Sequence, residues 1–198
     1  MSESISREAK KIEILNTAEN LFAHFGLKKT SLEDIAESIG YAKTSIYYYF
    51  KSKSDIFRAV IERETNIFIK TLNKEINKYE RPEDKLITYF LIRMDYLNKQ
   101  VNLKKITKKV ITELLPLIDK ERAKFINAEK EIVVNILKDG IKKKVFKMED
   151  PEFVAITMIS SIKGLETSLL TYLNRNTTTA DYEAILDILF NGILMEKR

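Results

Sequence analysis

Apolar residues recur every three or four positions along most of the 198-residue chain. This spacing places them on one face of an α-helix, whereas a half-buried strand would alternate apolar and polar residues. Turn signals are few, since the sequence contains only 5 glycines and 3 prolines. The pattern therefore predicts an all-α fold of about nine helices.

A helix-turn-helix is predicted within the first fifty residues. One apolar face, from Ile12 to Phe25, predicts a first helix that Gly26 can end, because glycine readily adopts the left-handed conformation. The stretch TSLED then offers two overlapping capping boxes, Thr30 with Glu33 or Ser31 with Asp34, that open a short second helix. Gly40 separates this helix from a third short helix over residues 43–50, which completes the motif.

The third helix carries three consecutive tyrosines, which cannot all face one core because successive helical residues point about 100° apart. With Ile46 and Phe50 placed inward, the outward positions are Thr44, Ser45, Tyr47 and Tyr48, with Tyr49 at the rim. Hydroxyls and aromatic edges on this face suit the major groove of DNA, where they meet base edges and phosphate oxygens. The alternative is that the tyrosines cover a helix junction.

Beyond residue 52 the apolar faces predict longer helices. A fourth helix, opening near Lys53 and running to about residue 78, would connect the first fifty residues with the rest. Lys53 would place a cation beside free backbone N–H groups, where a phosphate could bind. Pro116 is expected to interrupt the helical pattern, and further helices are expected over residues 118–144, 151–173 and 178–195. We therefore expect a DNA-binding domain of residues 1–52 and a second helical domain of residues 53–198.

The amino-acid composition excludes several kinds of functional site. The chain has no cysteine, which excludes disulfides, thiolate metal sites and cysteine nucleophiles, and His24 is its one histidine. It also lacks a glycine-rich phosphate loop and metal-ligand spacing, so we expect no enzyme, no metal and no cofactor. A net charge of +5 and a pI near 9.1 are compatible with a nucleic-acid partner, although many basic proteins bind none.

The sequence also carries a prediction about the compartment. The first thirty residues contain lysines and glutamates where a signal peptide would need an apolar stretch. No run of about 18 uncharged apolar residues occurs. We therefore expect a cytoplasmic protein without a membrane partner.

The stretch TSLEDIAESIGYAKTSIYYYFKSKSDIF resembles the DNA-binding segment of the TetR family of bacterial transcriptional regulators, and the resemblance extends over residues 10–60. It follows the family's threonine-rich helix start, Ile-Ala, Gly, then Leu-Tyr-x-His-Phe and Ser-Lys. The resemblance implies a homodimeric repressor that binds a palindromic DNA operator and is released by a small effector. It also implies that residues 53–198 form the ligand-binding and dimerisation domain.

Carried over by position, the resemblance assigns base reading to Lys43, Thr44, Ser45 and Tyr47. It assigns phosphate contacts to Tyr48, Tyr49 and Lys53, and backbone contacts to Thr30 and Ser31. The chain departs from the family at Thr44, where glycine is frequent, at Tyr49, where histidine is commonest, and at Glu33, where some members use arginine. We expect Glu33 to serve a capping box, so that the second helix makes no base contact.

The remaining expectations concern the second domain. The resemblance places the dimer interface on the last two helices of each subunit, where Gly164 and Gly192 would allow close approach; the alternative is two ordinary core helices. Inward positions of the middle helices are candidates for an effector pocket, with Glu113 and Glu166 as possible polar groups: Phe90, Met94, Leu97, Val110, Leu114 and Phe125. Such a pocket would suit a small hydrophobic or amphipathic effector, but each residue could equally be plain core.

Two further alternatives stay open. A basic stripe could attract an anionic headgroup or simply be a solvated helix face: Lys104, Lys105, Lys108 and Lys109. The main rival function is a DNA-binding protein of the same fold without small-molecule control, which is regulated by a protein partner or acts structurally. These two functions differ in whether the second domain holds a ligand cavity.

Overall fold

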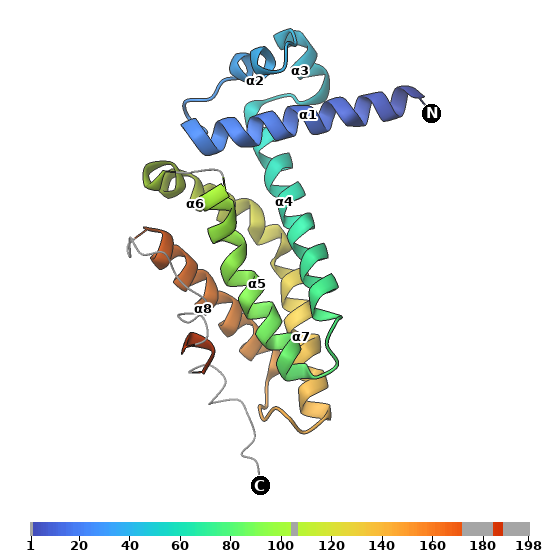
Figure 1. The fold of residues 1–198 in the computed structure, drawn as a ribbon, viewed down its shortest axis with the longest axis vertical. Coiled ribbons are helices and arrows are strands. Elements are labelled where there is room, and N and C mark those ends of the chain that lie inside the picture. Colours follow the sequence, from blue (N-terminus) through green and yellow to red (C-terminus); the bar gives the residue numbers. More distant parts are fainter. Residues whose placement is uncertain (1, 104–106, 172–183, 188–198) are drawn as a thin grey trace. The chain divides into compact units, whose positions relative to one another are not determined.

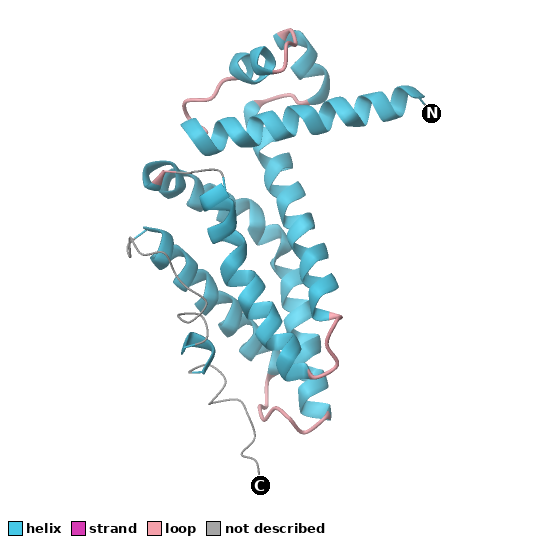
Figure 2. Ribbon diagram, viewed as in Figure 1, coloured by secondary structure: helices cyan, strands magenta, loops and turns pink. Residues whose placement is uncertain are grey.

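The structure is a computed structural model that describes residues 2–103, 107–171 and 184–187. Within these ranges it contains the α-helices α1–α8, one short 3-10 helix, a further helical turn at residues 184–187 and no β-sheet, which confirms the predicted all-α fold (Figures 1 and 2). None of these helices is both long enough and apolar enough to cross a lipid bilayer. The helices are α1 (Ser2–Phe25), α2 (Leu32–Ser38), α3 (Lys43–Tyr49), α4 (Lys53–Ile76), α5 (Pro82–Leu103), α6 (Lys108–Arg122), η1 (Ala123–Phe125), α7 (Ile126–Lys142) and α8 (Pro151–Thr171).

By backbone packing the chain divides into two compact units. The first contains Met1–Asn66 and Val101–Ala123, and the second contains Ile67–Gln100 and Lys124–Arg198. The first unit therefore holds α6 together with α1–α3, although α5 lies between them in sequence. The expected end of the DNA-binding domain, between residues 52 and 53, stays a prediction.

The core of the first unit is built from the apolar faces of five helices. In Figure 1, α2 and α3 lie together along one side of α1. Ile46 and Phe50 are both buried in this core, as the pattern of α3 predicts. Phe22 of α1 meets Phe57 of α4 edge to face, with ring centroids 5.8 Å apart. Burial of these faces against one another holds the helix-turn-helix in place.

Local signals fix the turns between the short helices. Gly26 and Gly40 have φ angles of 84° and 66°, so both adopt the left-handed conformation expected after a helix. Of the two possible capping boxes, the structure forms the one between Ser31 and Asp34. The Asp34 amide donates to Ser31 Oγ at 3.1 Å, and the Ser31 amide donates to Asp34 Oδ2 at 2.7 Å.

Some expectations about the helices are wrong. The helix α6 runs through Pro116, and the break falls instead at η1, so the predicted helix over 118–144 is divided. A proline removes one amide donor but leaves the rest of a helix able to form when its apolar face is buried, as it is here. Ile12 and Phe25, which the pattern places on the apolar face of the first helix, are exposed. The last predicted helix, with Gly192, lies outside the described residues apart from 184–187.

The second unit has its own core, formed by the later part of α4 with α5, α7 and α8. At the C-terminal end of α7, the amides of Val145 and Phe146 donate to the carbonyl oxygen of Gly140 at 2.8 and 3.2 Å. This turn brings the buried ring of Phe146 against Gly140, where an added Cβ would lie 2.1 Å from a ring carbon. Glycine is therefore required at this position by the close approach of the ring.

Candidate nucleic-acid interface

The short helix α3 presents the polar face that its sequence predicts. Its one fully buried side chain, Ile46, is 0% exposed, whereas Tyr47 and Tyr48 are 48% and 65% exposed. The neighbouring candidates Lys43, Thr44 and Ser45 are also exposed, and Tyr49 is half-buried. The structure therefore brings the candidates of α3 together on one accessible surface. Adjacent exposed aromatic side chains beside basic residues form a candidate binding surface.

Cationic side chains lie over the tyrosine rings of this region. The Arg7 guanidinium carbon is 5.0 Å from the centre of the Tyr48 ring, and Tyr48 meets Tyr49 edge to face at 5.1 Å. Lys10 Nζ lies 6.0 Å from the centre of the Tyr41 ring. The hydroxyl of Tyr41 donates to Glu13 Oε2 at 2.7 Å, which raises the pKa of Tyr41. The sequence prediction did not include Arg7 or Lys10, although their spacing already places them on one side of α1.

Lys43 is held by a carboxylate of the neighbouring helix. Its ammonium forms an ion pair with Glu33 of α2, and both side chains are exposed. The hydrogen bond to Lys43 lowers the pKa of Glu33 below its ordinary value, and the same bond raises the pKa of Lys43 above its ordinary value. Both groups are therefore charged at neutral pH. The expectation that Glu33 serves a capping box is wrong, because Asp34 fills that position.

Replacing Glu33 with glutamine is expected to raise affinity for DNA a few-fold. The change frees Lys43 for phosphates or bases and removes a negative charge next to the DNA-facing side of α3. Fluorescence anisotropy with a labelled duplex measures the change. Glu37→Gln is the control, since it removes the same charge from an exposed position of α2. An equal gain in both variants would attribute the effect to net charge and not to Lys43.

Three other candidates have internal partners. The hydroxyl of Thr30, which is 2% exposed, donates to the carbonyl oxygen of Gly26 at 2.9 Å and has no access to DNA. Ser31 supplies the cap of α2. Lys53 Nζ donates to the carbonyl oxygens of Leu27 and Thr30, both at 2.6 Å, and so ties the start of α4 to the α1–α2 loop. These contacts position α2 and α3, whereas any phosphate contact by Lys53 stays a prediction.

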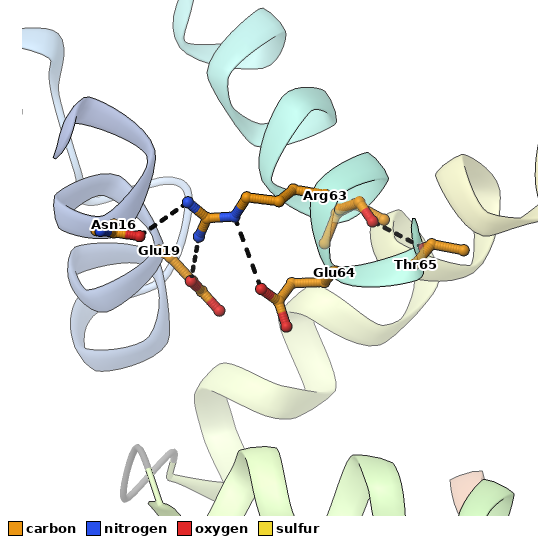
Figure 3. Close-up of polar contacts among 6 residues, drawn as sticks. Asn16, Glu19, Arg63, Glu64 and Thr65 are labelled. Atoms are coloured by element: carbon orange, nitrogen blue, oxygen red, sulfur yellow. Dashed lines mark hydrogen bonds and ion pairs between the residues drawn. The ribbon is translucent and has the colours of Figure 1, made fainter. Parts of the chain in front are cut away.

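Arg63 fixes α4 against α1 (Figure 3). One guanidinium nitrogen donates to Asn16 Oδ1 at 2.8 Å and the other to Glu19 Oε2 at 2.7 Å, while Nε lies 3.8 Å from Glu64 Oε1. The planar guanidinium can hold several partners at once, which a lysine could not do with the same geometry. Arg63 therefore joins the first part of α4 to α1 within the first unit. Sequence reasoning did not single it out.

The structure divides the proposed effector residues between two cores. Phe90 and Met94 are buried in the second unit, whereas Val110 and Leu114 belong to the core of the first. Glu113 also lies in the first unit, where the Lys28 amide donates to its Oε1 at 3.1 Å. The other candidates do not add to either group: Phe125 is half-buried in η1, and the side chains of Leu97 and Glu166 lie outside the described residues. Of the basic stripe, only Lys109 has a described side chain, and it is exposed.

A buried polar network in the second unit was also missed. Glu129 Oε1 accepts hydrogen bonds from the Tyr89 hydroxyl at 3.0 Å and from Arg93 Nε at 2.9 Å. Arg93 is only 4% exposed, and its guanidinium carbon lies 5.8 Å from the centre of the Phe68 ring. A charged side chain is rarely buried this fully without a partner. Sequence alone cannot distinguish it from a surface arginine.

Comparisons with known proteins agree with this arrangement. The profile described as "Bacterial regulatory proteins, tetR family" matches residues 14–60. The HTH-type transcriptional regulator RutR of Escherichia coli is 42% identical over 64 residues, which are 32% of this chain and 30% of RutR. The chain thus matches less than a third of the length of this curated relative.

Solved structures extend the likeness to almost the whole chain. A transcriptional regulator from Cytophaga hutchinsonii is 29% identical, with a TM-score of 0.71 over 92% of this chain and 97% of its own. A protein from Saccharomonospora viridis, solved in complex with choline, has a TM-score of 0.77 over 96% of this chain and 100% of its own. At 20% identity, the second likeness concerns the fold alone. The matched segment contains the helix-turn-helix described above, so residues 14–60 are identified as a helix-turn-helix of the type found in the TetR family of bacterial transcriptional regulators.

Proposed function

We propose that this protein is a homodimeric transcriptional repressor that binds a palindromic DNA operator and is released by a small hydrophobic or amphipathic effector. The observation that carries this proposal is the exposed face of α3, whose residues Lys43, Thr44, Ser45, Tyr47 and Tyr48 stand on a helix anchored by buried Ile46. The match of residues 14–60 to a family of transcriptional regulators supports the same conclusion. Such a repressor acts in the cytoplasm, where its operator lies.

On DNA, α3 would enter the major groove. Lys43, Thr44, Ser45 and Tyr47 would meet base edges, and Tyr48 and Tyr49 would meet phosphates. Two subunits related by a two-fold axis would each read one half of the palindrome. Their recognition helices would then lie about 34–36 Å apart, if they occupy successive major grooves.

Release by an effector requires that the ligand prefer a state in which this spacing is lost. We propose that the ligand binds among the apolar side chains of the second unit, where Phe90 and Met94 lie, and that α4 carries the change. The chain of α4 supports this role because it is continuous from the first unit into the second. The choline complex of the Saccharomonospora viridis protein supports the idea that this fold accommodates a small ligand. A coupling of about 1–3 kcal/mol would change operator affinity about 5–150-fold.

Selection of random duplex DNA by the purified protein, followed by sequencing of the retained duplexes, tests the proposal. Enrichment of a palindrome is the expected result, and that duplex then allows compounds to be screened for those that release it. If no sequence is enriched by folded protein, the repressor proposal fails. If a palindrome is enriched but no small molecule releases it, control by a protein partner replaces the effector.

Tyr47→Ala is expected to reduce discrimination among operators. Loss of one base contact costs about 1–3 kcal/mol, so the preference for the correct base pair at one position of each half-site should fall about tenfold or more. Competition titrations with duplexes changed at single base pairs measure this. Tyr47→Phe, which keeps the ring and loses only the hydroxyl, separates ring contact from hydrogen bonding. Unchanged discrimination in the alanine variant would mean that Tyr47 does not read bases.

A further inference from the structure

Three basic residues form one face of the first half of α1. Arg7, Lys10 and Lys11 are spaced three and four positions apart, which places them side by side on a helix. The side chains of Arg7 and Lys10 are exposed, and Lys11 is half-buried. All three lie before residue 14, where the match to the family profile begins. A role for this face is therefore not implied by the matched segment.

This basic face adjoins the tyrosines of α3. One concavity, with a volume of about 190 Å³, is lined by Lys10, Tyr41, Ser45, Tyr48 and Tyr49. Another, lined by Arg7, Glu8, Lys11 and Tyr49, lies beside it, since both share Tyr49. Residues of α1 and of α3 line both concavities, so the basic face of α1 lies next to the tyrosines of α3.

The cations of this surface keep their charge available. Among the side chains that the structure describes, none of the three basic residues forms an ion pair, and Arg7 and Lys10 lie over tyrosine rings instead. A ring orients a cation without neutralising it, whereas a carboxylate such as Glu33 cancels the charge of Lys43. The acidic groups beside them are Glu8 and Glu13, and Glu13 accepts the Tyr41 hydroxyl. The surface is therefore suited to an extended anion.

We propose that Arg7, Lys10 and Lys11 form a second DNA contact, which binds the phosphate backbone next to the stretch met by α3. The proposal rests on the DNA-binding function proposed above and extends it to α1. Because phosphates carry no sequence information, this contact adds affinity and salt dependence but does not change which sequence is preferred. It also orients α3, since two separate points of attachment on the backbone fix its angle in the groove.

The test is the full-length triple variant Arg7→Gln, Lys10→Gln and Lys11→Gln. Its dissociation constant for a fluorescein-labelled duplex of random sequence is measured at several salt concentrations, beside that of the parent protein. We expect at least tenfold weaker binding at low salt. The slope of log affinity against log salt should fall by about one for each phosphate that the variant no longer binds. With a selected operator, the ratio of specific to random binding should stay unchanged.

A matched control removes the same charge elsewhere. The control is a second triple variant, in which three exposed lysines of the second unit are replaced: Lys138→Gln, Lys142→Gln and Lys147→Gln. Its affinity for DNA should stay within about twofold of that of the parent. Arg7→Lys with the other two residues intact should keep the parent's salt slope, and circular dichroism should show the same melting for every variant. The inference would be overturned if both triple variants lost the same affinity for DNA, or if the α1 variant kept the salt dependence of the parent. Neither outcome would affect the proposed function. A parent protein that binds no duplex would overturn the proposed function as well.

Discussion

Replacing Glu129 with alanine is expected to lower the free energy of unfolding by about 3–5 kcal/mol. Its Oε1 accepts from both the Tyr89 hydroxyl and Arg93 Nε, at 3.0 and 2.9 Å. The change removes the acceptor that these two groups share and leaves the guanidinium charge of Arg93 less compensated in a core that solvent hardly reaches. Removing one partner of a buried ion pair costs more than the pair itself contributes.

Urea denaturation followed by circular dichroism measures the change. Asp139→Ala is the control, because it breaks the pair between Asp139 and Lys143, 2.8 Å apart, at a partly exposed position of the same unit. Exposed pairs contribute at most about 1 kcal/mol, so the two variants should differ clearly. Glu129→Gln keeps an oxygen acceptor and should lose less than alanine. Equal denaturation midpoints for Glu129→Ala and Asp139→Ala would contradict the assigned role.

Replacing Phe146 with alanine is expected to cost about 3–5 kcal/mol, as truncation of a buried phenylalanine does. The ring is 2% exposed and lies against Gly140, so its loss leaves a cavity beside α7 that the helix cannot easily fill. The opposite change, Gly140→Ala, forces a methyl group to a position 2.1 Å from a ring carbon and should cost about 1–3 kcal/mol through overpacking.

A double-mutant cycle separates this contact from other effects. Once Phe146 is alanine, the methyl group at position 140 has space, and alanine is a better helix former than glycine by about 1 kcal/mol. Gly140→Ala should therefore be neutral or stabilising in the Phe146→Ala background and destabilising in the parent. If it destabilises both backgrounds equally, the ring is not what excludes a side chain at position 140.

Local signals were sufficient for the helix-turn-helix. The glycine turns at Gly26 and Gly40 and the inward position of Ile46 depend on residues close in sequence, and all three are confirmed. Helix ends were less predictable, because α6 continues through Pro116 when its apolar face has a core to pack against. A signal that tertiary packing can override is only a weak guide to where a helix stops.

The candidate effector residues show a different limit. Periodicity correctly marks Val110 and Leu114 as buried, but it does not say against which core they pack. They follow α5 in sequence and yet join α1–α3 in the first unit. The network of Arg93 with Glu129 joins residues 36 positions apart. The sequence does not distinguish a buried arginine or glutamate from an exposed one. Spacing does reveal the basic face of α1, but not which helix lies beside it.

The place of α6 in the first unit also affects how the protein is synthesised. Val110 and Leu114 of α6 complete a core whose other buried members lie before residue 66, so the nascent chain carries that core unfinished while α5 is being made. Partly folded chains with uncovered apolar surface are prone to aggregation, and contacts distant in sequence form later than local ones. The helix-turn-helix is therefore expected to reach its full stability on the ribosome only after residue 123 has emerged. A fragment that ends at Asn66 would lack Val110 and Leu114 and should fold less stably than the same residues within the whole chain.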